Sequence, residues 1–284
     1  MDILATIDRD GYSGISALMA TIRELDIHKW IIGAETGAGG FKHWQCRFKT
    51  RLEDKEEVTG LKWDEKSGTV KQIKETVTAD AQLTRILRQK LGDGVMIYTA
   101  KCSDAWEYET KEGCYLASWD TMEVRRTRFG KPTWAQKEAL QALQRTNDRE
   151  VMVWYDPTGN IGKSWLTNHL YEKGLAYCIP ATMKDVEMII KTTASLASKD
   201  REAGYPPRPY VIIDIPRSWK WSNQLYTAIE TIKDGLIMDP RYTAQPINIR
   251  GVKVMVMTNT RPQLDKLSKD RWWIHEQSIQ PSLP

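Results

Sequence analysis

The sequence predicts two domains of different fold class, an α+β domain over residues 1–120 and an α/β domain over residues 151–284, joined by residues 121–150. Three observations support this division. The first part alternates short apolar runs with stretches of helical spacing. The last part contains runs that are apolar on both faces, as parallel strands covered by helices require. Between them lies a basic stretch with glycine and proline, which is typical of a junction.

The first domain is predicted from its apolar spacing. Short apolar runs indicate three strands, over residues 3–7, 29–33 and 43–48. Apolar residues three and four apart indicate three helices, over residues 16–25, 73–91 and 105–116. A glycine-rich loop, residues 35–40, joins the second strand to the third. Strands that alternate with packed helices in this way are typical of a small α+β domain.

Residues 121–150 combine a charged linker with an amphipathic helix, predicted over 133–143, and are a candidate segment for self-association. Beyond them, three continuous apolar runs predict the strands of a parallel sheet, over residues 151–155, 210–214 and 252–257. Helical segments lie between these runs, which indicates an α/β sandwich.

The composition excludes several classes of protein. The chain is 41% apolar and 27% charged, as expected of a soluble globular protein, and no apolar run approaches the roughly 18 residues of a membrane span. Four cysteines without CxxC spacing argue against a zinc module or a disulfide scaffold. A net charge of +4 is small for a protein that binds nucleic acid by bulk charge, so any DNA contact is expected to use local groups.

The strongest motif is a phosphate-binding loop that lies between a predicted strand and a predicted helix. Its residues are Pro157, Thr158, Gly159, Asn160, Ile161, Gly162, Lys163 and Ser164. Glycines let backbone N–H groups turn toward phosphate oxygens, the lysine reaches the β- and γ-phosphates, and the serine holds Mg²⁺. Pro157 replaces the usual first glycine, and we expect it to stiffen the loop. The motif predicts binding and hydrolysis of Mg²⁺-ATP.

Two further residues follow the other apolar runs. Asp214 ends the second run and is expected to position Mg²⁺, and Asn259 follows the third and is expected to contact the γ-phosphate or the attacking water. A second acid usually follows the first, but Ile215 stands there, so the base that activates water is unassigned, with Glu230 only a guess.

A candidate metal site lies in the first domain. His43 and Gln45 are two residues apart on a predicted strand and so share one face. Glu35 precedes them across the glycine-rich loop, which can bring its carboxylate to the same place. Carboxylate, imidazole and amide oxygen suit Mg²⁺ or Mn²⁺. From the residues alone, a lone histidine beside Trp44 is more often structural than a metal ligand.

A candidate nucleophile lies further along the chain. Tyr108 and Lys111 are three residues apart on a predicted helix and so lie on one side of it. A tyrosine can attack phosphorus and leave a covalent phosphotyrosine, and a nearby ammonium lowers the pKa of the phenol. The alternative is an amphipathic helix with a packed tyrosine and a solvated lysine.

Taken in order, these motifs resemble those of the replication initiator (Rep) proteins of circular single-stranded DNA viruses. His43, Trp44 and Gln45 are similar to the metal motif of rolling-circle endonucleases, with Glu35 as third ligand, and residues 108–113 are similar to the tyrosine motif. The phosphate loop, Asp214 and Asn259 resemble the motifs of a superfamily 3 helicase. These motifs are similar to those of the smacovirus branch of the family.

The resemblance implies fold and activity. It implies an N-terminal nuclease domain with an antiparallel sheet, similar to ferredoxin and RRM folds, before a P-loop ATPase domain. It implies metal-dependent nicking and rejoining of single-stranded DNA at an origin stem-loop through a 5′-phosphotyrosine on Tyr108. It also implies a helicase ring, expected to be a hexamer, with Arg271 as an arginine finger, and a DNA-gripping hairpin near residues 241–253. We expect no membrane partner, and residence in the nucleus of a eukaryotic host or otherwise in the cytoplasm.

Two other functions are compatible with parts of the sequence. One is an ATP-driven motor that binds the origin and does not cut it. The other is a small-molecule kinase with the same phosphate loop, against which the candidate residues of the first domain argue.

Overall fold

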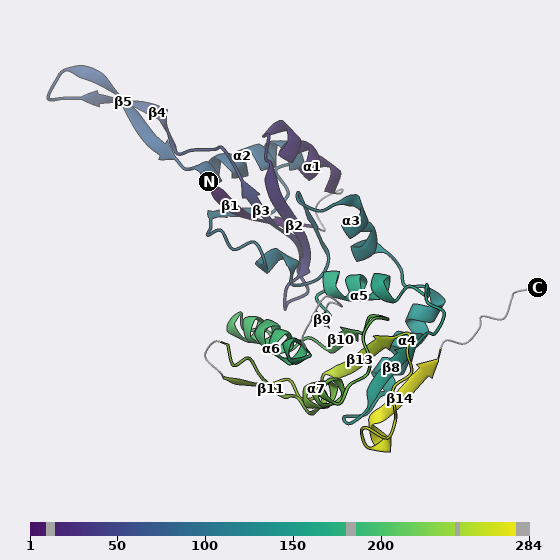
Figure 1. The fold of residues 1–284 in the computed structure, drawn as a ribbon. Helices are drawn as coiled ribbons and strands as arrows, with labels where there is room; N and C mark the ends of the chain where they lie inside the picture. The colour runs from purple at the N-terminus through teal and green to yellow at the C-terminus, as the bar shows by residue number, and fades with distance from the viewer. Residues whose placement is uncertain (10–14, 180–185, 242–244, 277–284) are drawn as a thin grey trace, which may run out of the picture. The chain divides into compact units, whose positions relative to one another are not determined.

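The computed structural model describes residues 1–9, 15–179, 186–241 and 245–276. It divides the chain into two compact units, residues Met1–Arg125 and Arg126–Pro284 (Figure 1). The first unit is an α+β fold with an antiparallel sheet and the second an α/β fold with a parallel sheet, so both predicted fold classes are confirmed.

The first unit is built on a five-stranded antiparallel sheet in the order β6-β1-β3-β2-β7. Its strands are β1 (Asp2–Asp8), β2 (Lys29–Thr36), β3 (Lys42–Lys49), β6 (Ile97–Lys101) and β7 (Tyr115–Ala117). The predicted strands correspond to β1, β2 and β3. Because side chains alternate along a strand, each of these strands has one face for a core and one for a site.

Helices α1 (Ile15–Glu24) and α2 (Ala79–Leu91) pack with one face of this sheet. Ile3, Ala5 and Ile7 of β1 are fully buried there, together with side chains from both helices, while the alternate residues of β1 are only partly buried. The apolar alternation of β1 therefore assigns its even-numbered residues to the opposite face of the sheet.

A long hairpin follows β3 and corrects one prediction. Strands β4 (Lys55–Asp64) and β5 (Thr69–Val77) pair with each other in a separate two-stranded sheet that projects from the first unit (Figure 1). The helix predicted over 73–91 is therefore wrong for its first residues. It begins only at Ala79, after Thr78, whose side chain caps it by accepting the N–H of Ala81 at 3.4 Å.

The helix predicted over 105–116 is also wrong. The segment contains a single 3₁₀ turn, η1 (Tyr108–Thr110), and then enters β7. Trp106 and Glu109 are buried by contacts with the sheet, so the apolar spacing that indicated a helix comes from tertiary packing.

Helices α3 (Met122–Phe129) and α4 (Trp134–Arg145) lie in the segment between the two predicted domains. The helix predicted over 133–143 is confirmed as α4. Thr133 begins it with a capping box, in which Thr133 accepts the Gln136 N–H and the Gln136 side chain accepts the Thr133 N–H at 2.8 Å. Buried residues of α4 pack with the sheet of the second unit.

The second unit contains a five-stranded parallel sheet in the order β14-β8-β13-β10-β9. Its strands are β8 (Val151–Tyr155), β9 (Ala176–Ile179), β10 (Tyr210–Asp214), β13 (Lys253–Thr258) and β14 (Trp272–Glu276). The three predicted apolar runs are β8, β10 and β13. Each is buried along nearly its whole length, as expected of strands covered on both faces.

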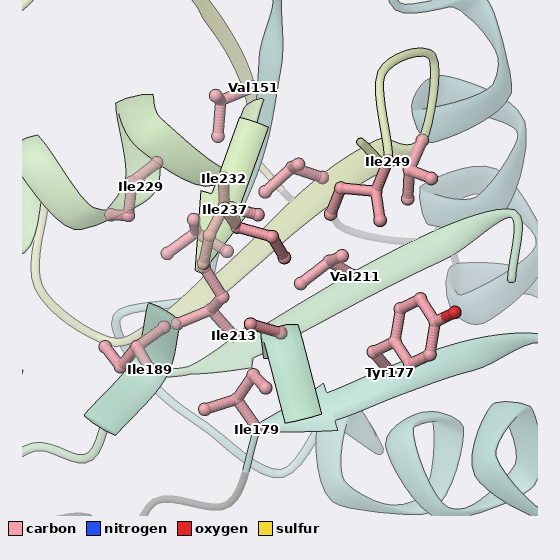
Figure 2. Packing of buried hydrophobic residues seen from close by; sticks show 14 of the residues in the cluster. Val151, Tyr177, Ile179, Ile189, Val211, Ile213, Ile229, Ile232, Ile237 and Ile249 are labelled. Atoms are coloured by element: carbon pink, nitrogen blue, oxygen red, sulfur yellow. The ribbon is translucent and has the colours of Figure 1, made fainter. Parts of the chain in front are cut away.

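Two helical layers cover this sheet. Helix α5 (Lys163–Glu172) packs with α4 on one face, and α6 (Glu187–Glu202) and α7 (Asn223–Asp234) pack on the other. Figure 2 shows the core on the face covered by α6 and α7. Val211 and Ile213 of β10 belong to this cluster together with Ile229 and Ile232 of α7. The alternation along each strand divides its side chains between the two cores.

Strands β11 (Leu236–Met238) and β12 (Pro246–Asn248) form a small antiparallel pair. Of the two, β12 lies within residues 241–253, where a DNA-gripping hairpin was expected, and β11 lies before them. Residues 242–244 of that region lie outside the described residues. Within the described part of the chain, no helix has the length and apolar character needed to cross a membrane.

Candidate functional site

The predicted metal residues lie together on the sheet face opposite α1 and α2. The turn at residues 37–40 returns the chain so that Glu35 of β2 pairs directly with His43 of β3, and the same register pairs Gly33 with Gln45. The Glu35 Oε2 atom is 3.7 Å from His43 Nε2. Gln45 is fixed beside them, because its Oε1 accepts the Thr6 hydroxyl at 2.9 Å.

The predicted nucleophile pair joins this group through Lys111. Its Nζ donates to the Tyr108 hydroxyl at 2.7 Å and lies 2.7 Å from Glu35 Oε2. Burial lowers the pKa of Lys111, but its hydrogen bonds to Glu35 and Tyr108 outweigh this and raise that pKa above its usual value. A cation therefore lies between the tyrosine and the carboxylate, while the Tyr108 side chain stays 47% exposed and open to a substrate.

The side chains of Glu35 and His43 have the donor pattern of metal ligands. The Nδ1 of His43 lies 3.2 Å from the Phe41 carbonyl, which can only accept, so the proton of a neutral ring is on Nδ1 and the lone pair on Nε2 faces Glu35. Glu35 is 4% exposed, and its Oε1 has no hydrogen-bond partner. A buried acceptor without a partner is costly unless an ion or water satisfies it, so these residues fit Mg²⁺ or Mn²⁺.

No cluster of three His, Cys, Asp or Glu side chains arranged to hold a metal ion occurs among the residues that the structure describes. The predicted set contains two such side chains and the amide of Gln45. Asp8 of β1 is the register partner of His43 on its other side, so carboxylates flank the histidine on both neighbouring strands. The sequence analysis missed Asp8, whose signal is its place at the end of the first strand.

A buried ion pair holds the turn that carries Tyr108. Arg47 Nε lies 3.0 Å from Glu109 Oε1, and both residues are almost fully buried. Burial raises the pKa of Glu109, and the Arg47 hydrogen bond opposes that rise. A Cβ on Gly33 would lie 2.5 Å from the Glu109 carbonyl oxygen, so glycine is required for the turn to approach β2. The sequence analysis missed these residues, although Arg47 continues the alternation of His43 and Gln45.

The phosphate loop has the strand–loop–helix context that the motif requires. It leaves β8 and enters α5 at Lys163, with Ser164 as the second residue of the helix. Gly159 and Gly162 have φ of 89° and 84°, in the left-handed region that glycine tolerates. Gln136 of α4 supports the loop from outside by donating to the Gly162 carbonyl at 2.9 Å.

The carboxylate of Asp156 lies within the phosphate loop. Its Oδ1 accepts the N–H groups of Thr158 at 3.1 Å and Gly159 at 2.8 Å, and its Oδ2 lies 3.2 Å from Lys163 Nζ. Burial alone would raise the pKa of Asp156, but the hydrogen bonds from Gly159, Thr158 and Lys163 hold it below its usual value. The loop thus directs backbone donors and its lysine at an internal anion. Asp156 begins the phosphate-loop segment of the sequence, but no role of its carboxylate was predicted.

The other predicted nucleotide-site residues lie at the same edge of the sheet. Strand β13 is between β8 and β10, and all three are parallel, so Asp214 and Asn259 lie near the loop at their carboxyl ends. Asn259 Nδ2 donates to the Asp156 carbonyl at 2.5 Å. Burial raises the pKa of Asp214, and Lys163 partly offsets this. Ile215, where a second acid is usual, is buried in the core.

Two arginines of the second unit differ in their environment. Arg271, predicted as an arginine finger, is 6% exposed and pairs within the chain with Asp234 at 2.7 Å and with Glu230 at 3.4 Å. These contacts direct Arg271 and Glu230 toward each other, and they do not direct either residue toward the phosphate loop. Arg217 is exposed and donates to the Thr158 carbonyl at 3.0 Å. Its position three residues after Asp214 is the signal by which it could have been found.

Comparisons with known proteins give a consistent set of relatives. No protein-family model matches the chain. It is 29% identical over 178 residues to Para-Rep C6 of Subterranean clover stunt C6 alphasatellite, covering 60% of this chain and 49% of that protein. It is 30% identical to Para-Rep C10 of Milk vetch dwarf C10 alphasatellite, over 48% and 45% of the two chains. It is 27% identical to the Master replication protein of Faba bean necrotic yellows virus (isolate Syrian SV292-88), over 57% and 49%. The chain spans about half the length of these relatives.

Proposed function

We propose that this chain initiates rolling-circle replication by nicking and rejoining single-stranded DNA. The chain is homologous to the Rep proteins of circular single-stranded DNA viruses and their satellites. The homology confirms the resemblance found in the sequence, and the assignment to the smacovirus branch stays a prediction. The observation that carries the proposal is Lys111, whose ammonium connects the Tyr108 hydroxyl to Glu35 beside His43.

In the proposed nicking step, the Tyr108 oxygen attacks the scissile phosphorus. A bond forms between phosphorus and the Tyr108 oxygen, and the bond from phosphorus to the 3′-oxygen breaks. The products are a 5′-phosphotyrosine and a 3′-hydroxyl. The phenol loses one proton, and the leaving 3′-oxygen gains one. The Lys111 ammonium, 2.7 Å from the Tyr108 oxygen, adds positive charge next to the atoms on which negative charge develops. In rejoining, a 3′-hydroxyl attacks the phosphotyrosine and the same ammonium stabilises the departing phenolate.

Glu35, His43 and Gln45 are the residues that would hold Mg²⁺ or Mn²⁺. Such an ion, when bound, polarises the scissile phosphate and stabilises the charge that develops on it. Arg47 and Glu109 hold the tyrosine turn against the same sheet face through their 3.0 Å ion pair. The geometry thus supports a tyrosine delivered to one fixed position, which is what a positioned nucleophile needs.

The second unit is proposed to hydrolyse Mg²⁺-ATP and to drive unwinding of DNA. The backbone donors of residues 157–162 and Lys163 would bind the phosphates, and Ser164 with Asp214 would hold Mg²⁺. Asn259 lies beside the loop, where it would sense the γ-phosphate. With Ile215 in place of the second acid, the base that activates water is left to another residue.

The proposal includes the partners that this activity requires. Single-stranded DNA and an origin stem-loop are the substrates, and self-association into a ring, as a hexamer, would complete the helicase. The intrachain ion pairs of Arg271 do not support it as the residue that reaches a neighbouring subunit. We propose nuclear residence in a eukaryotic host and cytoplasmic residence otherwise.

The experiment that tests the nuclease is formation of a covalent protein–DNA adduct. The full chain is incubated with a labelled single-stranded oligonucleotide of its own origin, with Mn²⁺ or with a chelator, and the products are separated on a denaturing protein gel. We expect a labelled protein band that requires Mn²⁺ and is absent for Tyr108→Phe. The Lys163→Ala variant serves as the matched control, because it disables the ATPase and leaves the nuclease unit unchanged.

A different result separates the alternatives. If no adduct forms while DNA stimulates the ATPase, the chain is an origin-binding motor that does not cut. If DNA stimulates neither activity and a small-molecule acceptor is phosphorylated, the kinase function is correct.

A further inference from the structure

The even-numbered face of β1 extends the candidate nuclease site toward the edge of the sheet. In the register of the first unit, Thr6 of β1 pairs with Gln45 on one side and with Tyr98 of β6 on the other. Residues directly opposite one another on neighbouring strands point to the same face. Tyr98, Thr6 and Gln45 therefore form one row across three strands, and Tyr98 is at the edge of the sheet.

Exposure falls steadily along this row. Tyr98 is 63% exposed, Thr6 is half-buried and Gln45 is 6% exposed. A large aromatic side chain with most of its ring in water costs free energy that a partner would recover. Neighbouring strands are about 4.8 Å apart, so the Tyr98 backbone is roughly 10 Å from that of Gln45. This is a short extension of the candidate active site.

We propose that Tyr98 is a stacking platform for a base of single-stranded DNA, next to the nucleotide that Tyr108 attacks. The inference rests on the proposed nuclease function and adds a DNA-binding subsite to it. A phenol ring offers an apolar face to any base, so the contact tolerates different sequences. It would hold the strand on the open face of the sheet while Tyr108 attacks the scissile phosphate.

A groove borders the edge strand on its α2 side. This open groove of about 560 Å³ lies between α2 and β6, and Tyr98 lines it together with Arg85 and Arg88. Asp80 and Asp93 also line it, so the charges in the groove balance. A contact made here by stacking should therefore depend little on salt, in contrast to phosphate contacts, which weaken as counter-ions compete.

The test measures binding of a fluorescein-labelled oligothymidylate by fluorescence anisotropy. All variants are made in the full-length Tyr108→Phe chain without ATP, so that neither covalent attachment nor helicase action contributes. We expect Tyr98→Ala to raise the Kd by about 5- to 150-fold, the range that corresponds to loss of one stacked base. We expect Tyr98→Phe to bind like the parent, because the ring is kept, and the salt dependence to keep its slope in both variants.

The control is Tyr171→Ala, which removes a tyrosine that is 57% exposed in the second unit. We expect it to leave the Kd unchanged. Photocrosslinking of a 5-iodouracil oligonucleotide provides a second measurement that does not depend on affinity, and we expect the crosslinked peptide to contain Tyr98.

Three results would overturn the inference. The first is an unchanged Kd for Tyr98→Ala, and the second is a crosslink confined to peptides without Tyr98. Failure of the proposed function is distinguishable, because it would show as no adduct when the native chain, with Tyr108 in place, is incubated with its origin, whatever Tyr98 binds. A loss of binding with Tyr98→Ala that Tyr98→Phe shares would assign the effect to the hydroxyl and also refute stacking.

Discussion

Replacement of Asp156 by asparagine isolates the charge that the phosphate loop holds when no nucleotide is bound. Asparagine keeps an oxygen to accept the Thr158 and Gly159 N–H groups but removes the negative charge 3.2 Å from Lys163 Nζ. In the native chain, Lys163 must leave this carboxylate before it can reach a phosphate. A hydrogen bond between charged groups contributes about 1.5–3 kcal/mol. Breaking the contact between Lys163 and Asp156 therefore opposes nucleotide binding by a comparable free energy.

Asp156→Asn is therefore expected to change nucleotide affinity and stability in opposite directions. The Kd for a fluorescent ATP analogue with Mg²⁺ should fall by about tenfold, which corresponds to about 1.4 kcal/mol. The free energy of unfolding without nucleotide should fall by about 1.5 kcal/mol, measured by denaturant titration. Asp265→Asn, which removes an exposed charge in the same unit, should change neither quantity.

The pH dependence of stability gives the same prediction an independent check. The folded-state pKa of Asp156 is lowered, so its contribution is present above the unfolded pKa of about 3.9 and is lost as the pH falls through the folded pKa. The stability difference between the native chain and Asp156→Asn should thus be complete at neutral pH and disappear in strong acid. Weaker nucleotide binding by Asp156→Asn would refute the reasoning and make Asp156 part of the nucleotide site.

Three further predictions concern the first unit. Lys111→Met should slow adduct formation by about 100-fold because it removes the positive charge 2.7 Å from the Tyr108 oxygen; the rate of adduct formation measures this, and an unchanged rate would contradict it. Arg47→Leu should lower the free energy of unfolding by about 3–5 kcal/mol, because it leaves Glu109 buried without its partner. Arg85→Leu, which breaks an exposed ion pair, should lower it by less than about 1 kcal/mol in the same denaturant titration. Equal losses for the two variants would contradict a stabilising buried pair. Gly33→Ala should abolish formation of the adduct, because the added Cβ would displace the turn at the Glu109 carbonyl. A normal yield of adduct on the denaturing gel would show instead that the turn can shift freely.

The sequence was sufficient to predict three of the five strands in the parallel sheet of the second unit. Strands β8, β10 and β13 are apolar on both faces, a pattern that only covered parallel strands require. Helix α4 was predictable for a local reason, because Thr133 and Gln136 form a capping box. The phosphate loop was found from its own residues, since its glycines and lysine act within one short segment.

The hairpin of β4 and β5 and the turn at Tyr108 were not predictable from local patterns. Both faces of the hairpin are largely exposed, so neither strand alternates between core and water. Ile73 and Val77 instead continued the helical spacing of α2, although both lie on β5. The turn at Tyr108 is fixed by Arg47, which is 61 residues earlier in the chain, and such a contact leaves no periodic signal.

The candidate site was partly predictable for the same reason. Glu35 and His43 were placed together because a glycine-rich turn joins neighbouring strands, and their pairing depends on that turn alone. The contact of Lys111 with Glu35 requires the tertiary fold. The role of the Asp156 carboxylate was not predicted because it contacts residues that the motif assigns to phosphate.

Covalent attachment of Tyr108 to DNA can be measured directly by mass spectrometry. The adduct is formed by the full chain on its own origin with Mn²⁺ and is then digested with protease and nuclease. We expect a nucleotide phosphate on the peptide that contains Tyr108, and on no other. A nucleotide on another residue, such as Tyr115 of β7, or the absence of any modified peptide from a chain with active ATPase, would contradict it.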